Sequence, residues 1–437
     1  MTTITLKYGK GHFDVDIPDE NLAGVILPEE LAGVPDEAAE IHRALENPIG
    51  SPKLRDKVKA GMKVVDDYKV VDDYRVVDDY RVVDDYRVVV IISDVTRPVP
   101  SYKFLPMLLD ELNAGGVPDS NITIVVALGS HRKSTPEEHK ALLGQSYGRV
   151  RCIDQDKYDA KYVGTSSFGH RIEVFREIVD ASFVVCTGNI EYHYFAGYSG
   201  GVKAILPGCS SHDTIQNNHE MMRSPKAETG RMDSPIRVEI DEVYSMVKPG
   251  FLLDVVLNSR KEIVTVVAGD PIQAHRKGIE YVDRMYSVKV PTADIVITSA
   301  GGYPKDINMY QAQKAMDNAK HVVKQGGTMI MVAECEECLG NDVFACWVDE
   351  ATTLDEQAAR MDKKFELGGH KASVIARTAQ KCEICLVSKI PDETVRKMFL
   401  QPVKTPQEAL DAALKKHGPN AKVLVSPYGG MMLPKSA

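Results

Sequence analysis

The sequence has little cysteine and no long apolar run. Its eight cysteines in 437 residues are too few and too scattered for the disulfide framework of a small secreted protein. No stretch reaches the ~20 apolar residues that a membrane helix needs. Residues 1–7 also lack a basic segment followed by an apolar one, so they do not resemble a signal peptide. We therefore predict a cytoplasmic protein that does not bind membranes.

A basic excess is also missing. Lys and Arg number 53 against 62 Asp and Glu, which gives a formal net charge of -9. Because nucleic acids and anionic membrane surfaces attract basic proteins, this balance argues against either as the main partner. The G-x-G-x-x-G spacing of a dinucleotide-binding loop is absent after every predicted strand. Any anionic ligand must therefore be held by local features of the fold.

Strand-like runs alternate with helical patterns along most of the chain. Apolar runs typical of buried strands occupy residues 88–92, 122–128, 181–186 and 294–298. Helical patterns follow three of them: one at residues 102–114, one after Thr135-Pro136, and one that carries Tyr310, Gln311 and Lys314. This alternation predicts an α/β protein with mostly parallel sheets flanked by helices. Since 437 residues are too many for one core, we expect two domains, 1–275 and 285–437.

A six-residue repeat interrupts the first predicted domain. The hexad Val-Val-Asp-Asp-Tyr-Lys, with Arg replacing Lys in later copies, fills residues 64–87. Its period is far shorter than that of solenoid repeats and matches neither strand nor helix periodicity. We interpret it as a tandem duplication inserted before a strand, with an extended arm as the alternative.

Pairs of polar residues follow the predicted strands at their carboxyl ends, the position where open α/β sheets bind ligands. Those pairs are Asp94 with Arg97, His131 with Arg132, His193 with Lys203, and Gln311 with Lys314. Two histidines could act as a general acid and base, because imidazole titrates near neutral pH. Arg132, Gln311 and Lys314 could hold a carboxylate. Gln311 and Lys314 are spaced to share one helix face.

The glycine-rich stretch 187–208 is the most patterned of these loops. It follows the strand at 181–186 and precedes a helix that Ser210 or Ser211 could cap and that carries His219. The glycines either form a flexible turn or allow the backbone to approach a ligand.

Two cysteine pairs suggest a different kind of site. Cys335 with Cys338 and Cys382 with Cys385 have spacings that resemble a four-thiolate zinc site. The second pair lies at a strand-like run, where side chains alternate between faces, so buried free thiols are the alternative.

At these motifs the sequence resembles the nickel-dependent lactate racemase family and its wider homologues. The matching segments are residues 93–98, 129–132, 191–208 and 301–314, together with His219. The match covers nearly the whole chain apart from the hexads. The resemblance implies a two-domain α/β protein whose active site lies in the cleft between the domains.

The resemblance also implies a cofactor, the nickel pincer nucleotide. This is nickel held by a pyridinium-3-thioamide-5-thiocarboxylic acid mononucleotide, and enzymes that build it would be transient partners. The implied tether is Lys203 and the implied nickel ligand is His219. The other cofactor-binding residues carried over are Asp94, Thr96, Arg97, Gly200 and Gly201.

The implied reaction is racemisation of a 2-hydroxy acid through a keto acid, by hydride transfer. His131 and His193 are the implied acid and base, and Arg132, Tyr310, Gln311 and Lys314 the predicted substrate contacts. A sugar-acid epimerase with the same cofactor and a zinc-stabilised protein that binds a small acid remain alternatives.

Overall fold

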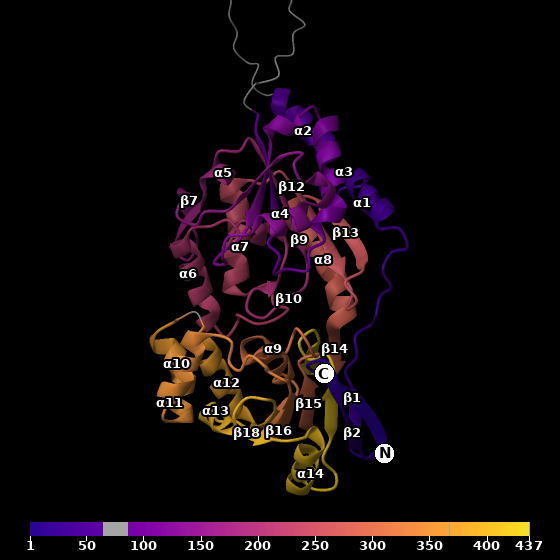
Figure 1. Cartoon of the computed structure of the whole chain (residues 1–437), viewed down its shortest axis with the longest axis vertical. Helices are drawn as coiled ribbons and strands as arrows, with labels where there is room; N and C mark the ends of the chain where they lie inside the picture. Colours follow the sequence, from indigo (N-terminus) through magenta and orange to yellow (C-terminus); the bar gives the residue numbers. More distant parts are fainter. Residues whose placement is uncertain (64–85, 367, 437) are drawn as a thin grey trace, which may run out of the picture. The chain divides into compact units, whose positions relative to one another are not determined.

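The computed structural model describes residues 1–63, 86–366 and 368–436. These residues form two compact units (Figure 1). One unit comprises Glu30–Asp283, and the other combines Met1–Glu29 with Arg284–Ala437. Both are α/β structures with parallel-dominated sheets, as predicted. The hexad repeat at 64–87 falls almost entirely outside the described residues.

The unit Glu30–Asp283 is built on a six-stranded sheet. In spatial order its strands are β13 (Ile263–Gly269), β12 (Phe251–Leu257), β9 (Phe183–Asn189), β4 (Val88–Ser93), β5 (Ile122–Ala127) and β6 (Arg151–Asp154). All neighbours pair in parallel except β12 and β13. Strand β4 lies between β9 and β5, and its apolar residues 88–92 are buried, as expected for a parallel strand covered on both faces.

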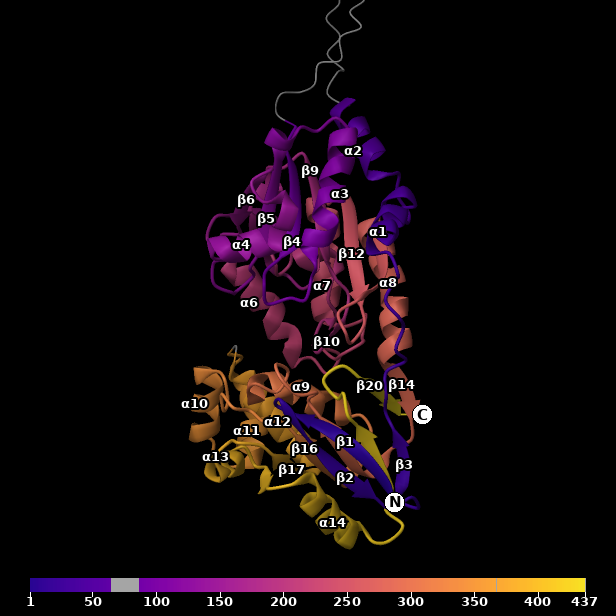
Figure 2. The same cartoon turned by 45° about the vertical axis from the view of Figure 1, so that its right-hand side comes forward.

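Three helices cover one face of this sheet: α1 (Glu37–Glu46), α2 (Leu54–Lys63) and α3 (Ser101–Ala114). Their apolar side chains pack against alternate residues of β4 and β5, which leaves the other alternate residues for the opposite face. Figure 2 shows these helices beside the strands. The burial of so many Leu, Ile and Val side chains is the main source of stability in this unit.

The helices after β5 and β9 begin as their sequences predict. Helix α4 (Pro136–Leu143) starts at a capping box, in which the Glu138 amide donates to Thr135 and the Thr135 amide donates to Glu138. Helix α6 (His212–Glu220) is capped by Ser211. The remaining elements of the unit are β7 (Ala160–Thr165), β8 (Arg171–Phe175), α5 (Arg176–Val179), β10 (Tyr192–His193), β11 (Gly197–Tyr198), α7 (Pro235–Val247), α8 (Pro271–Tyr286) and the short 3-10 turns η1 (Asp119–Asn121), η2 (Gly144–Ser146), η3 (Gly201–Ala204) and η4 (Met221–Arg223).

The second unit has a parallel six-stranded sheet of its own. Its order is β18 (Gln401–Val403), β17 (Glu383–Val387), β16 (Val323–Val332), β15 (Ala293–Ser299), β19 (Val423–Ser426) and β3 (Leu22–Val25). Its helices are α9 (Met309–Ala319), α10 (Asp342–Glu350), α11 (Leu354–Lys363), α12 (His370–Lys381), α13 (Asp392–Lys397) and α14 (Pro406–His417). Strands β14 (Ser287–Val290) and β20 (Leu433–Ser436) pair with each other.

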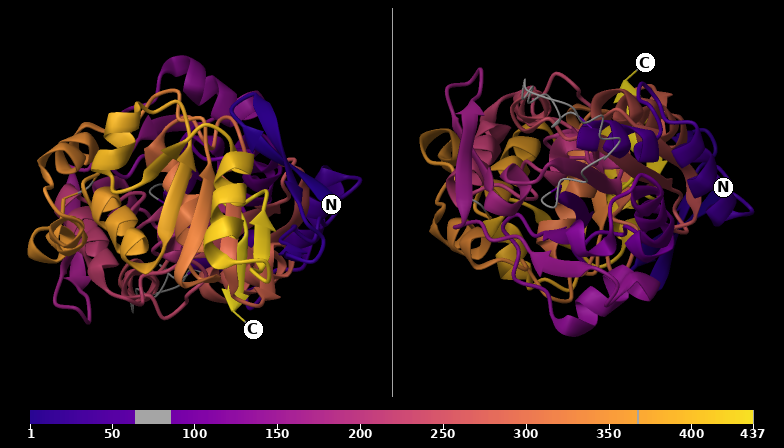
Figure 3. Two further views of the ribbon diagram at one scale, coloured as in Figure 1. Left: turned by 90° about the horizontal axis from the view of Figure 1, so that it is seen from below. Right: turned by 90° about the horizontal axis from the view of Figure 1, so that it is seen from above.

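The start of the chain belongs to this second unit, which corrects the expected domain 1–275. The hairpin of β1 (Thr2–Tyr8) and β2 (Gly11–Ile17) packs its apolar side chains into the same core as β15, β16 and α14. Strand β3 pairs with β19, and the Gly9 amide donates to the buried Asp306 at 2.7 Å. Figure 3 shows the indigo hairpin beside the orange and yellow C-terminal elements. Pairing between segments so distant in sequence leaves no local sequence pattern.

Other differences concern single elements of the second unit. The strand β20 and the helices α10 and α12 were not predicted. Helix α12 buries polar side chains, among them His370, Lys371 and Ser373, so its buried face lacks the apolar periodicity of a core helix. None of the described helices is long and apolar enough to cross a membrane.

Candidate active site

The loop after β4 and the loop after β5 bring Asp94 and His131 together. The ring Nδ1 of His131 lies 2.6 Å from Oδ2 of Asp94. The Thr96 hydroxyl donates to the other carboxylate oxygen at 2.7 Å. Asp94 is only 4 % exposed, so burial alone would raise its pKa, but the hydrogen bonds from His131 and Thr96 outweigh burial and lower the pKa. Asp94 is therefore an ionised acceptor at neutral pH.

This contact fixes which nitrogen of His131 can exchange a proton. Because Nδ1 faces a carboxylate, Nδ1 carries a hydrogen and Nε2 of the neutral ring has the lone pair. The His131 side chain is 40 % exposed, whereas that of Asp94 is 6 % exposed. His131 is thus a partly accessible base whose ring is oriented by a buried carboxylate.

Arg132, predicted as a carboxylate contact, is held by the protein itself. Its guanidinium makes two hydrogen bonds to Glu138, at 2.6 and 2.8 Å, and lowers the pKa of Glu138 to about 2. The side chain is 68 % exposed. Its charge is already neutralised by the carboxylate at the start of α4.

His193 lies in an aromatic cluster on the short β10–β11 ribbon. The Ala196 amide donates to its Nδ1 at 3.3 Å, a long hydrogen bond. The ring of Phe195 stands edge-on to His193, with centroids 4.4 Å apart, and also edge-on to His219 at 5.1 Å. Phe195 therefore links the predicted acid/base residue to the predicted metal ligand, a role that the sequence analysis missed.

Lys203 lies in η3, in the loop between β11 and α6. Burial, and then the charges of the nearby Arg97 and Arg237 guanidinium groups, lower the pKa of its amine to about 7, against the opposing effect of Glu191. An amine with this pKa is largely unprotonated slightly above neutral pH, the form that can act as a nucleophile. The loop thus presents a lysine whose chemistry differs from that of a solvated surface lysine.

His219 projects from α6 and is half-buried, with its Nδ1 atom shielded from solvent. Burial, and then the charge of Lys203, lower the pKa of its imidazole to about 4. Its Nδ1 has no hydrogen-bond partner among the described residues. A neutral imidazole with a buried, unpartnered nitrogen has the protonation state that a metal ligand needs.

The described part of the chain does not by itself supply a complete metal site. Among the described residues, no group of three or more His, Cys, Asp or Glu side chains could hold a metal ion. A metal at His219 would therefore need further donors from a bound cofactor. The same finding argues against the zinc site considered for Cys335, Cys338, Cys382 and Cys385, all of which are free thiols.

In the second unit, the predicted substrate contacts lie at the start of α9. Lys314 donates to the side-chain oxygen of Gln311 at 2.9 Å, so the two share a helix face as predicted. The ring of Tyr310 faces the ammonium of Lys371, which lies 5.1 Å from the ring centroid. Burial, and then the charge of Lys314, lower the pKa of Lys371 to about 7. Lys371, on α12, was not predicted because the sequence around it has no recognisable motif.

The two glycines predicted to bind a cofactor have a structural reason of their own. Gly200 and Gly201 have φ values of 75° and 65°, which side chains rarely adopt. A Cβ on Gly200 would lie 2.6 Å from the Asp254 carboxylate, and one on Gly201 would lie 2.9 Å from the His275 ring. The space beside both glycines is therefore filled by buried side chains of β12 and α8.

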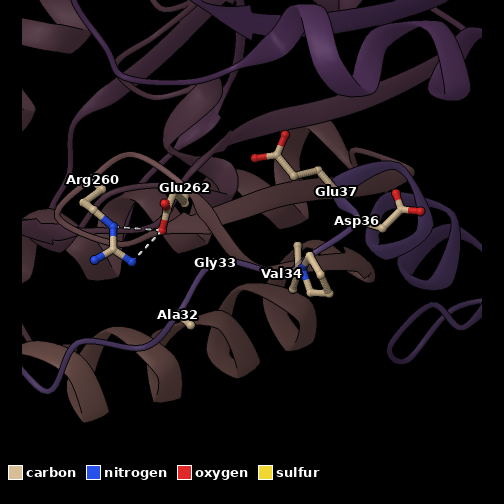
Figure 4. A pocket seen from close by; sticks show the side chains of 8 residues that line it. Ala32, Gly33, Val34, Asp36, Glu37, Arg260 and Glu262 are labelled. Atoms are coloured by element: carbon tan, nitrogen blue, oxygen red, sulfur yellow. Dashed lines mark hydrogen bonds and ion pairs between the residues drawn. The ribbon is translucent and has the colours of Figure 1, made fainter.

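A surface hollow elsewhere in the first unit contains none of the predicted site residues. It is lined by residues 32–37 with Arg260 and Glu262 (Figure 4). Arg260 and Glu262 pair with each other at 2.9 Å. The residues that line this hollow include neither a nucleophile nor a histidine.

Comparison with known families identifies both parts of the chain. A family model described as the lactate racemase N-terminal domain matches residues 8–74 and 79–230, and one described as the lactate racemase C-terminal domain matches residues 288–433. Together these matches include all of the predicted site residues.

Whole-chain relatives and solved structures agree with these matches. The chain is 34% identical to a lactate racemase of Thermoanaerobacterium thermosaccharolyticum, over 98% of both proteins. It is 33% identical to a lactate racemase of Lactiplantibacillus plantarum, over 98% of this chain and 99% of that protein. The apoprotein structure of a T. thermosaccharolyticum lactate racemase superposes with a TM-score of 0.87, at 32% identity, over 99% of this chain and 100% of that one. A Thermotoga maritima protein at 19% identity shares the fold, with a TM-score of 0.57 over 89% of this chain and 99% of that one.

Proposed function

We propose, from the premise that the chain belongs to the lactate racemase family, that it interconverts the enantiomers of lactate or of a closely similar 2-hydroxy acid. The observation that carries this proposal is the pairing of His131 with the buried, ionised Asp94 at 2.6 Å. A positioned imidazole base is what removal of a hydroxyl proton requires. The enzyme is accordingly an isomerase.

In the proposed reaction His131 takes the hydroxyl proton of one enantiomer through Nε2. Asp94 would hold the ring in place and stabilise the imidazolium that forms, because its carboxylate is ionised and buried beside Nδ1. His193 would serve the mirror-image enantiomer. Racemisation needs a second acid/base group. If the central carbon and the carboxylate of the substrate are held in place, the hydroxyl groups of the two enantiomers point in different directions.

The substrate carboxylate is proposed to bind Gln311 and Lys314. Their side chains are hydrogen-bonded to each other and lie at the start of α9. An ammonium and an amide donor on one helix face match the two oxygens of a carboxylate. Arg132 is the weaker candidate, because Glu138 already occupies its guanidinium. Tyr310 is proposed to line the same site.

Lys203 and His219 are proposed to hold the nickel pincer nucleotide. Lys203 offers a buried amine for the covalent link, and His219 offers a neutral imidazole for the metal, which suits nickel together with sulfur donors. When bound, that group would accept hydride from the substrate carbon and return it. Asp94, Thr96, Arg97, Gly200 and Gly201 would line the cofactor, with Arg97 close enough to Lys203 to influence the pKa of its amine.

Cofactor-building enzymes are the proposed transient partners, and the cytoplasm is the proposed compartment in which they would meet this chain.

The test is to produce the protein with and without those enzymes and to assay D- and L-lactate by chiral chromatography, together with a panel of other 2-hydroxy acids and sugar acids. The proposal predicts conversion of lactate in both directions only after co-production. Conversion of sugar acids alone would instead favour the epimerase.

A further inference from the structure

The loop that carries Lys203 is held by three buried ionisable side chains. Arg237, Asp254 and His275 are all buried, at 0%, 0% and 1% exposure. They come from α7, β12 and α8, and each makes a hydrogen bond to the backbone of residues 196–201. None of the three belongs to the proposed acid/base, substrate or metal set.

Arg237 and His275 donate to carbonyl oxygens of the loop. Arg237 donates through Nε to Ala196 at 3.3 Å, and through its terminal nitrogen to Tyr198. His275 donates through Nε2 to the Ser199 carbonyl at 2.8 Å. Arg276 donates to the other ring nitrogen of His275 at 3.1 Å, and burial lowers the pKa of His275 well below its ordinary value. His275 is therefore a neutral ring in the tautomer that donates to the loop.

Asp254 accepts from the loop on its opposite side. The Gly201 amide donates to its Oδ2 at 2.7 Å, while Oδ1 has no partner among the described residues. An ideal Cβ on Gly188 or Gly200 would approach the Asp254 carboxylate to 3.1 or 2.6 Å. These glycines thus make room for a carboxylate that accepts a hydrogen bond from the loop.

Buried ionisable groups are costly, so the fold retains them only where they are well compensated. Here Arg237 also pairs with Asp241 at 3.4 Å, and further compensation for all three side chains comes from backbone groups of one glycine-rich loop. Such a loop would otherwise sample many conformations, because glycine restricts the backbone least. Removing the loop from its present conformation would leave the Arg237, Asp254 and His275 side chains without these partners. The loop conformation and the burial of the three side chains therefore depend on each other.

We propose that Arg237, Asp254 and His275 are positioning residues, a buried clamp that fixes the backbone of residues 196–201 so that Lys203 is presented to the cofactor in one direction. The clamp acts through the backbone and does not touch substrate. It rests on the proposed role of Lys203 as the cofactor tether, but its effect on the loop can be measured in the protein without cofactor.

The first test is hydrogen exchange of the cofactor-free protein, read residue by residue by mass spectrometry. In the wild type the Gly201 amide should exchange as slowly as the amides of β12, because it donates to a buried carboxylate. Fast exchange of Gly201 in the wild type would overturn the clamp without the need for any variant.

The second test replaces His275. In His275→Leu the Ser199 carbonyl loses a buried donor, so the amides of residues 197–204 should exchange roughly five- to hundredfold faster. His275→Gln keeps an N–H donor of similar reach and should restore much of the protection. His139→Leu and His139→Gln are the matched controls, because His139 pairs with Asp154 at 2.8 Å in the same unit but contacts none of the loop.

Loading of Lys203 gives a readout that separates the clamp from the proposed function. After co-production with the cofactor-building enzymes, intact mass should show that His275→Leu carries a several-fold smaller fraction of modified Lys203 than the wild type or the His139 variants. Equal loading together with native exchange in a folded His275→Leu protein would overturn the clamp. An unmodified Lys203 in the wild type would instead contradict the proposed function and leave the exchange result as evidence on the loop.

Discussion

Replacing Asp94 with Asn tests how far the reaction depends on a charged partner for His131. The two side chains have the same size, so the change removes the negative charge while keeping the packing of a residue that is 4 % exposed. The amide can still contact Nδ1 of His131, but it cannot stabilise the imidazolium as a carboxylate does. The change also lets the side-chain NH2 group face Nδ1, which favours the wrong tautomer of the ring.

The size of the effect follows from the contact. A hydrogen bond to a charged group contributes about 1.5–3 kcal/mol. Because the Asp94 charge stabilises His131 mainly after the ring is protonated, losing this contribution should reduce turnover roughly ten- to hundredfold. KM for lactate should change little, because Asp94 is not a proposed substrate contact. The assay is the initial rate of racemisation in both directions, divided by the fraction of protein that carries the cofactor.

Asp154→Asn is the control, because Asp154 pairs with His139 at 2.8 Å in the same unit and has no proposed role in the reaction. It should keep wild-type turnover. The reasoning would be refuted if fully loaded Asp94→Asn protein turned over within about twofold of the wild type, or if the Asp154→Asn protein lost as much activity.

Three further predictions concern the substrate contacts, the metal ligand and a buried lysine. Lys314→Met should raise KM for lactate roughly tenfold or more with a smaller change in kcat, since an ammonium–carboxylate contact is lost, and steady-state kinetics in both directions measures this. His219→Ala should keep the added mass on Lys203 but lose most of the nickel, as elemental analysis would show. Lys371→Met should stabilise the protein most below about pH 7, because the wild type there pays to bury a charged lysine whose pKa is lowered to about 7. Between about pH 7 and the ordinary lysine pKa near 10.4, Lys371 binds a proton in the unfolded wild-type chain but not in the folded one, so the stability of the wild type rises with pH. The difference in the free energy of urea unfolding between Lys371→Met and the wild type should therefore shrink over this range. A difference that stays constant would contradict the low pKa.

The sequence predicted those parts of the fold that leave local patterns. The apolar run of β4, the capping box at Thr135 and the Ser211 cap of α6 are each specified by neighbouring residues, and the structure confirms them. The place of Met1–Glu29 in the second unit could not be predicted, because β3 pairs with β19 nearly the whole length of the chain away.

The site was predictable to a similar degree. Its loops were recognisable because polar residues follow apolar strands, and the structure brings Asp94 to His131 as that rule suggests. The clamp residues Arg237, Asp254 and His275 were missed, because each lies inside a helix or strand, where a single charged residue usually faces solvent. Their burial depends on contacts with a loop that only the folded chain provides.

Lys203 is proposed to tether a nickel-bearing cofactor, and the mass and metal content of the purified protein test this most directly. The chain should be co-produced with the cofactor-building enzymes, and Lys203→Arg should be prepared in parallel. We expect added mass that peptide mapping places on Lys203, with nickel in nearly equal amount, and neither in Lys203→Arg. An unmodified Lys203 with no nickel, in protein that still racemises lactate, would contradict this proposal.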